Sequence, residues 1–204
     1  MDHLVFASPD LNDGVEYIEQ RLGVEMSPGG RHLGFGTRNR LIGFGPDCYM
    51  EVVSVDPDEP DPAGPRWFGL SDLKEMRLVT WCAKASDLSG LVATGREAGI
   101  DLGKLSEGGR LRPDGSALRW TVTDPWADRA GGVIPFFIDW GDTVHPGTHL
   151  PSVCSLVGVR VEHPEPDIVR GWFQALGLDT SVSGGESPRV IATLNTPNGT
   201  VDLT

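Results

Sequence analysis

Three stretches of the chain share one pattern of apolar and polar positions. Each opens with an apolar run typical of a buried strand, followed by a polar turn and then by apolar residues at helical spacing. A glycine then ends the helical pattern, as expected for a residue that can adopt a left-handed backbone conformation. The three opening runs are residues 3–7, 78–83 and 156–161, and the three glycines are Gly23, Gly99 and Gly177. The chain is therefore predicted to contain an internal repeat.

The first copy shows the helical pattern most clearly. Leu11, Val15, Ile18 and Leu22 form one apolar stripe. Asp10 stands immediately before the stripe, where its carboxylate can accept hydrogen bonds from free backbone N–H groups. These features predict an amphipathic helix that packs on a sheet.

The segments after the helices also agree. Residues 27–31 (Ser-Pro-Gly-Gly-Arg) match residues 106–110 (Ser-Glu-Gly-Gly-Arg), with a weaker third match at 183–185. Strand-like runs follow these turns at residues 39–44, 49–55, 117–122, 133–140 and 190–194. The third copy ends at residues 201–203, so we expect it to lack a last strand.

The positions of the repeated strands, helices and turns predict a domain organisation. We expect a first module at 1–56, a linker at 57–75, a second module at 76–141, a loop at 142–153 and a partial third module at 154–204, all packed as one domain. Two such modules can place their sheets side by side, with helices outside, and enclose a cleft. The third module is expected to cover a sheet edge, either in its own chain or across a homodimer.

Composition narrows the classes of partner. The net charge of −12 and the lack of a basic patch argue against binding to nucleic acid or to anionic membranes. No apolar run approaches the roughly 20 residues of a membrane span, and Asp2 stands where a signal peptide would be positively charged. We therefore expect a cytoplasmic protein whose partner is a small molecule.

Four segments carry a family resemblance: residues 3–11, 17–23, 29–39 and 49–53. In these segments the chain resembles the vicinal oxygen chelate superfamily, and within it the glyoxalase-like domain proteins. The resemblance implies an α+β fold in which repeated βαβββ modules form a cupped mixed sheet with helices outside, as in glyoxalase and bleomycin-resistance proteins. A truncated third βαββ module would follow.

The resemblance also implies a metal site, because in that superfamily the ligands come from the first and last strands of each module. The first module would supply His3 and Glu51. The second module has Thr80 and, within a residue or so, Phe136 at the matching positions, and neither is a usual ligand. A divalent ion (zinc, iron, manganese or nickel) is thus one expectation, and no metal is the other.

Glu51 is the sharpest candidate for chemistry. It lies on a strand whose two faces are both largely apolar, and a buried carboxylate is costly unless it is paired or binds a metal. It could be a metal ligand, a general base, or the partner of an arginine on a neighbouring strand. His3 could be a ligand, a proton carrier or an ordinary edge histidine.

Further candidates lie in both modules. His32 and Asn39 occupy the glycine-rich hairpin of the first module, while apolar residues stand at the matched positions of the second, which favours a task of the first module alone. His32 is a candidate catalytic residue and third metal ligand, although an exposed hairpin would tolerate it equally well. The candidate substrate-binding residues are Asn39, Arg119, Trp120, Trp140 and His145.

Two functional hypotheses follow. In the first, the protein is a lyase, isomerase or dioxygenase whose divalent metal, held by His3, Glu51 and His32, polarises substrate oxygens while a side chain moves a proton. In the second, the cup is a metal-free pocket that binds or sequesters a small organic molecule. The missing ligands of the second module favour the second hypothesis, and the pairing of His3 with Glu51 favours the first.

Overall fold

The computed structural model of the chain describes residues 1–204 except 33, 63 and 112–116. Its three helices are α1 (Leu11–Leu22), α2 (Leu88–Glu97) and α3 (Pro166–Ala175), with short 3-10 turns η1 (Trp67–Gly69) and η2 (Pro146–His149). The strands are β1 (His3–Ala7), β2 (Ser27–His32), β3 (Thr37–Gly43), β4 (Tyr49–Val55), β5 (Arg77–Lys84), β6 (Ser106–Leu111), β7 (Ala117–Val122), β8 (Phe136–Asp139), β9 (Ser155–His163), β10 (Ser181–Gly184), β11 (Arg189–Thr196) and β12 (Gly199–Leu203).

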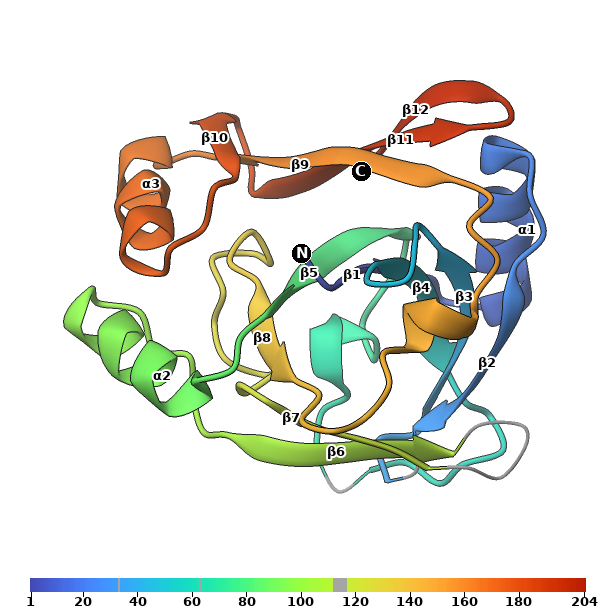
Figure 1. The fold of residues 1–204 in the computed structure, drawn as a ribbon, viewed down its shortest axis with the longest axis horizontal. Helices are drawn as coiled ribbons and strands as arrows, with labels where there is room; N and C mark the ends of the chain where they lie inside the picture. Colours follow the sequence, from blue (N-terminus) through green and yellow to red (C-terminus); the bar gives the residue numbers. More distant parts are fainter. Residues whose placement is uncertain (33, 63, 112–116) are drawn as a thin grey trace.

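The first two units build one curled sheet of eight strands in the order β2-β3-β4-β1-β5-β8-β7-β6. Each unit places its first strand parallel to its last, β1 beside β4 and β5 beside β8, and β1 joins β5 antiparallel at the centre. The outer strands β2 and β6 approach each other, so the sheet curls into a cup (Figure 1). The predicted α+β fold with a cupped mixed sheet and helices outside is confirmed.

Side chains of the main sheet point alternately to its two faces and form two separate apolar cores, one outside the cup and one inside it. Leu4 and Phe6 of β1 point outward, into the core shared with the helices. Val5 and Ala7 point into the cup, where they meet Val53 of β4. Because His3 has the same parity as Val5, the pleat directs its side chain into the cup as well.

Helix α1 begins and ends where its residues predict. The Asp10 carboxylate accepts hydrogen bonds from the backbone N–H groups of Asn12 and Asp13. Gly23 ends the helix with φ of 74°, a conformation that favours glycine. The buried residues Ile18 and Leu22 then fix α1 against the outside of the sheet.

The third unit differs from the expected truncated copy. It has a third strand after its helix, β12, which the tight turn at Pro197 and Asn198 pairs with β11. Its sheet also has another order, β10-β9-β11-β12, with β9 paired on both sides. Here the first strand, β9, runs parallel to β10 and antiparallel to β11, whereas the first strands of the other two units run parallel to their last strands.

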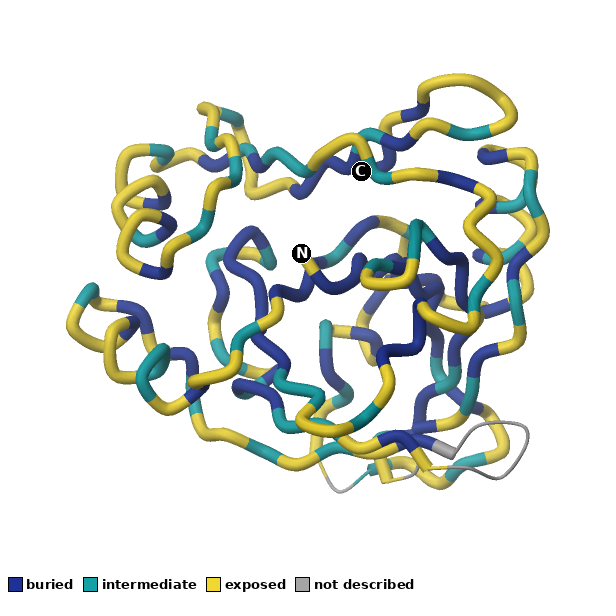
Figure 2. Tube along the Cα trace, viewed as in Figure 1, coloured by how far each residue is buried: buried dark blue, intermediate teal, exposed yellow. Residues whose placement is uncertain are grey.

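The third unit covers a face of the main sheet rather than an edge. Its apolar residues, including Val161 and Leu194, join the outer core with Leu4 and Trp81. The backbone N–H of Leu78 in β5 also donates to the carbonyl of Thr204 at 3.0 Å. This packing lies within the same chain, and Figure 2 shows β1 and β8 of the main sheet as buried segments in the middle of the molecule.

The segment predicted as a linker, residues 57–75, also contributes to the inner core. Trp67, Leu70 and Leu73 are buried inside the cup. Phe68, between them, has a φ of 56°, a value rare for a residue with a side chain. The interior of the cup is therefore partly filled by this segment. None of the described helices is both long and apolar enough to cross a membrane.

Candidate functional site

A small cavity of about 40 Å³ lies inside the cup. Both modules line it, the first through β1 to β4 and the second through β6 to β8. The described lining residues are His3, His32, Asn39, Tyr49, Glu51, Trp67, Phe68, Arg110, Trp120, Val122, Pro125, Phe136, Ile138 and Trp140. A cavity of this size has room for a few water molecules or a small chemical group.

Glu51 lies on the cavity wall with 6% of its surface exposed. Asn39 Nδ2 donates to Glu51 Oε2 at 2.6 Å. The orientation of the Asn39 amide is fixed, because its Oδ1 accepts a hydrogen bond of 2.9 Å from the backbone N–H of Gly30. Among the residues that the structure describes, Glu51 forms no ion pair. The bond from Asn39 therefore positions the carboxylate without neutralising it.

His32 is buried beside this pair. Its Nδ1 lies 3.0 Å from Thr37 Oγ1, and its Nε2 lies 3.4 Å from Asn39 Nδ2. Burial lowers the pKa of His32 to about 4, although the nearby charge of Glu51 opposes this shift. His32 is thus a neutral ring at neutral pH, and both of its nitrogens face groups of the protein.

His3 is held from behind by its sequence neighbour. Asp2 is fully buried, and its Oδ1 lies 2.6 Å from His3 Nδ1. Burial alone would raise the pKa of Asp2, but hydrogen bonds from His145 and His3 outweigh it and lower that pKa below its usual value. The ionised carboxylate holds a proton on His3 Nδ1, so the other nitrogen of a neutral ring, Nε2, carries a lone pair. Tyr49 stacks on the His3 ring at 4.6 Å, which also fixes its plane.

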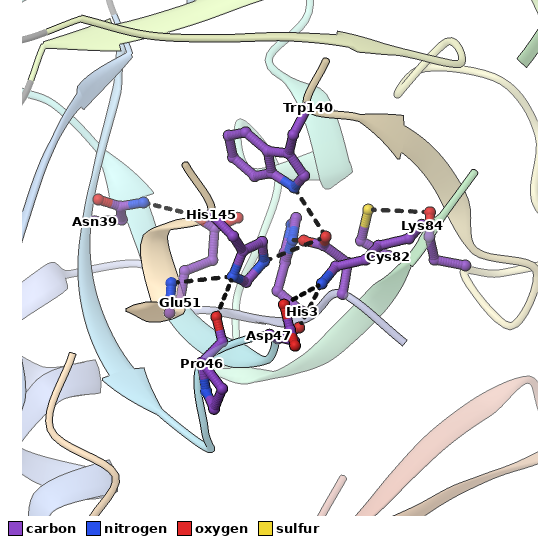
Figure 3. A network of polar contacts seen from close by, with 12 residues as sticks. His3, Asn39, Pro46, Asp47, Glu51, Cys82, Lys84, Trp140 and His145 are labelled. Atoms are coloured by element: carbon purple, nitrogen blue, oxygen red, sulfur yellow. Dashed lines mark hydrogen bonds and ion pairs between the residues drawn. The ribbon is translucent and has the colours of Figure 1, made fainter. Parts of the chain in front are cut away.

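Two further groups converge on Asp2. Trp140 Nε1 donates to Asp2 Oδ2 at 2.9 Å, and His145 Nε2 lies 3.3 Å from the same oxygen as a charge contact. His145 Nδ1 lies 3.1 Å from both the backbone N–H of Gly147 and the carbonyl oxygen of Pro46, and these contacts hold the ring with Nε2 facing the carboxylate. His3, Trp140 and His145 gather in one network, with Glu51 and Asn39 beside them (Figure 3).

A larger, open groove of about 840 Å³ adjoins the cavity. The two hollows share Arg110, Trp120 and Trp140 in their walls. Arg119 lines the groove and not the cavity. His145 lines neither hollow, because it lies behind His3, in contact with Asp2. The remaining predicted residues, His3, His32, Asn39, Glu51, Trp120 and Trp140, come together around the cavity.

Sequence reasoning missed Arg110, which figures there only as part of a repeated turn. The motif aligned Arg31 with Arg110, but the register of β2 shifts between Pro28 and Arg31. Arg31 therefore points outward and pairs with Asp56, whereas Arg110 is buried, with its NH1 3.4 Å from Asn39 Oδ1. No sequence signal marks the bulge beyond the Pro-Gly-Gly run at residues 28–30.

Asp2 and Phe68 were missed for other reasons. The acid at position 2 argues against a signal peptide, and its place directly before His3 is also a sequence signal for their pairing. Phe68 lay in the predicted linker, and nothing in the sequence indicates that this segment enters the cup.

The donors present do not form a complete metal site. Among the described residues, the one cluster with ligand atoms within 4.8 Å of one another is Asp2, His3 and Cys82. There the Asp2 oxygens already face protein donors, and burial raises the pKa of the Cys82 thiol, which disfavours the thiolate that metals bind. His3, Glu51 and His32 all reach the cavity wall, but they form no such cluster. Their role as metal ligands stays a prediction.

Comparison with known families decides the relationship. The family model described as the glyoxalase-like domain matches residues 1–177. The chain belongs to the glyoxalase-like domain family. This confirms the resemblance found in the sequence, and the match extends over both modules of the cup and into the third unit. A comparison with curated proteins found no match.

Solved structures resemble this glyoxalase-like protein to different degrees. A hypothetical protein from Staphylococcus aureus has a TM-score of 0.67 at 15% identity, covering 94% of this chain and 89% of its own. Methylmalonyl-CoA epimerase from Mycobacterium tuberculosis has a TM-score of 0.46 at 19% identity, covering 69% of this chain and 87% of its own. A variant of the Streptomyces coelicolor epimerase, in complex with 2-nitronate-propionyl-CoA, has a TM-score of 0.46 at 21% identity, covering 72% and 97%.

Proposed function

We propose that this glyoxalase-like protein is an enzyme of the isomerase or lyase type that moves a proton on a small organic substrate, with Glu51 as the general base. The observation that supports this most is the Glu51 carboxylate, buried at the cavity wall and held by Asn39 at 2.6 Å without an ion-pair partner among the described residues. A base needs this combination of fixed position and retained charge. The cytoplasm is the proposed location of this activity.

His3 is the proposed partner of Glu51 in proton transfer. The register pairs Val5 with Glu51 and His3 with Tyr49, so His3 and Glu51 are diagonal neighbours on one face of β1 and β4. A rise of about 3.3 Å per residue over two residues and a strand spacing of about 4.8 Å separate their Cα atoms by roughly 8 Å, which leaves room for a reacting group between the side chains. A proton taken by Glu51 from one side of a carbon could be returned from the other side by a His3 ring that carries a proton on both nitrogens, and the two groups would then exchange protons with solvent before the next turnover.

The experiment is solvent hydrogen exchange. Small ketones and carboxylic acids with a C–H bond beside the carbonyl are incubated with the protein in D2O, and loss of the C–H signal is followed by proton NMR. We expect exchange with the unmodified protein and a loss of at least about a hundred-fold in Glu51→Gln, in line with the contribution of a general base. Glu16→Gln, an exposed change on α1, is the control and should exchange normally. Exchange that survives Glu51→Gln would refute the proposal.

A second candidate is a metal-dependent enzyme of the same fold. It is favoured by the contact between Asp2 and His3, because metal-ligating histidines typically donate their other ring nitrogen to a carboxylate. Here His3 and Glu51 would be the ligands. Metal analysis of untagged protein purified without chelator should then show a stoichiometric divalent ion that His3→Ala and Glu51→Ala both lose. If no metal is found and no exchange occurs with any compound, the metal-free binding protein becomes the better account.

A further inference from the structure

The two adjoining hollows differ in size, so each can hold a different part of a substrate. The cavity of about 40 Å³ is far below the roughly 300–1,000 Å³ of typical ligand pockets, while the groove of about 840 Å³ lies within that range. A substrate whose reacting group reaches Glu51 must therefore have a small head in the cavity and a larger body in the groove.

The shared wall indicates what each part is made of. Trp120 and Trp140 lie edge to face, with ring centroids 5.4 Å apart, and both line both hollows. Gly108 makes room for one face of the Trp120 ring, since a Cβ on Gly108 would lie 2.3 Å from Trp120 Nε1. The junction is thus lined by two aromatic rings whose planes cross at 63°, which suits an apolar group that stacks on one ring and meets the edge of the other.

Arg110 supplies charge at the same junction. It has 8% of its surface exposed, lines both hollows, and reaches Asn39 Oδ1 at 3.4 Å, while the Asn39 amide donates to Glu51. A guanidinium presents a planar fork that matches the geometry of a carboxylate. A carboxylate held by Arg110 would lie close to Glu51, the proposed base, because Asn39 contacts both residues.

A second buried guanidinium stands behind the cavity wall. Arg129 lies 5.6 Å from the centroid of the Phe136 ring and 5.7 Å from that of Phe68, and both rings line the cavity. Its Nε has no hydrogen-bond partner, and it forms no ion pair with any described residue. Arg110 and Arg129 thus place two buried guanidinium groups near the cavity that Glu51 also lines, so an entering carboxylate would meet positive as well as negative charge there.

We propose that this site takes a carboxylate with a flat, apolar body: the carboxylate binds Arg110 in the cavity, and the body packs between Trp120 and Trp140 in the groove, on the face of one ring and the edge of the other. The inference rests on the proposed function, because it places the carbon beside the carboxylate near Glu51. It also predicts that the carboxylate binds, and binding can be measured without any catalytic step.

The probes are 1-naphthaleneacetate and its neutral analogue 1-naphthaleneacetamide, with binding measured by calorimetry and by quenching of tryptophan fluorescence. We expect the unmodified protein to bind the carboxylate at least about ten-fold more tightly than the amide, as expected for a charge-assisted pair. Arg110→Gln should lose this preference and Arg110→Lys should keep part of it. Arg40→Gln, an exposed change on β3, should keep it fully. Trp120→Leu should weaken both probes by a similar factor.

Each outcome decides the inference. Equal affinity of the unmodified protein for acid and amide overturns it, whether or not any variant folds. A preference that is lost in Arg119→Gln and kept in Arg110→Gln overturns it too, because the carboxylate would then bind in the groove. Glu51→Gln separates the two proposals: a preference retained in that variant, together with unchanged solvent exchange, supports the binding site and refutes the proposed base.

Discussion

The neutral, buried state of His32 has a measurable consequence for stability. His32 has 5% of its surface exposed, and burial lowers its pKa from 6.5 to about 4, against the opposing influence of Glu51. Between these two values the unfolded chain binds a proton that the folded protein does not. Stability should therefore fall as pH falls through this window, and the contribution should be lost completely below about pH 4.

The size of the effect follows from the shift. Each unit of pKa corresponds to about 1.4 kcal/mol, so a shift from 6.5 to about 4 corresponds to roughly 3 kcal/mol. Most of this, about 2.5 kcal/mol, should be lost between about pH 7.5 and about pH 4.5. The pKa of Asp2 is lowered from 3.8, so Asp2 titrates below this window and does not obscure it.

The assay is urea unfolding of the unmodified protein and of His32→Gln at both pH values. Glutamine retains a polar side chain next to Thr37 and Asn39 but does not titrate. The unfolding free energy of the unmodified protein should drop by about 2–3 kcal/mol more than that of His32→Gln. His149→Gln, which removes an exposed histidine, should behave like the unmodified protein. Parallel pH dependence in the unmodified protein and His32→Gln would show that His32 is not buried as a neutral ring.

Two further predictions concern how the site is positioned. Asp2→Asn should lower the free energy of unfolding by about 2–4 kcal/mol, because it breaks a buried charge network, and should slow solvent exchange about ten- to a hundred-fold, because it releases the His3 ring. Thermal unfolding measures the first effect and NMR exchange the second. Unchanged exchange would show that Asp2 does not orient His3. Gly29→Ala should lower exchange by a similar factor, since its Cβ would lie 2.2 Å from Asn39 Oδ1 and displace that amide. Gly158→Ala, whose Cβ meets nothing within 4 Å, is the matched control, and equal activity in both variants would contradict the role given to Asn39.

Local patterns in the sequence were enough to predict the cup. Apolar alternation, the cap at Asp10 and the stop at Gly23 are properties of short segments, and they recur in the second module. The strand parity that turns His3 and Glu51 to one face is also local, because successive side chains in a strand alternate. The family resemblance joined these segments into the correct sheet.

Tertiary structure decided what the sequence left open. The bulge between Pro28 and Arg31 turned Arg31 outward, whereas the regular pairing of β6 with β7 left Arg110 within reach of Asn39. The burial of Trp67 and Phe68, and the meeting of Asp2 with Trp140 and His145, join residues far apart in the chain. Such contacts depend on how whole elements pack, whereas periodicity and capping depend only on neighbours within a turn or a strand, so the sequence predicted the scaffold and the packing determined the site.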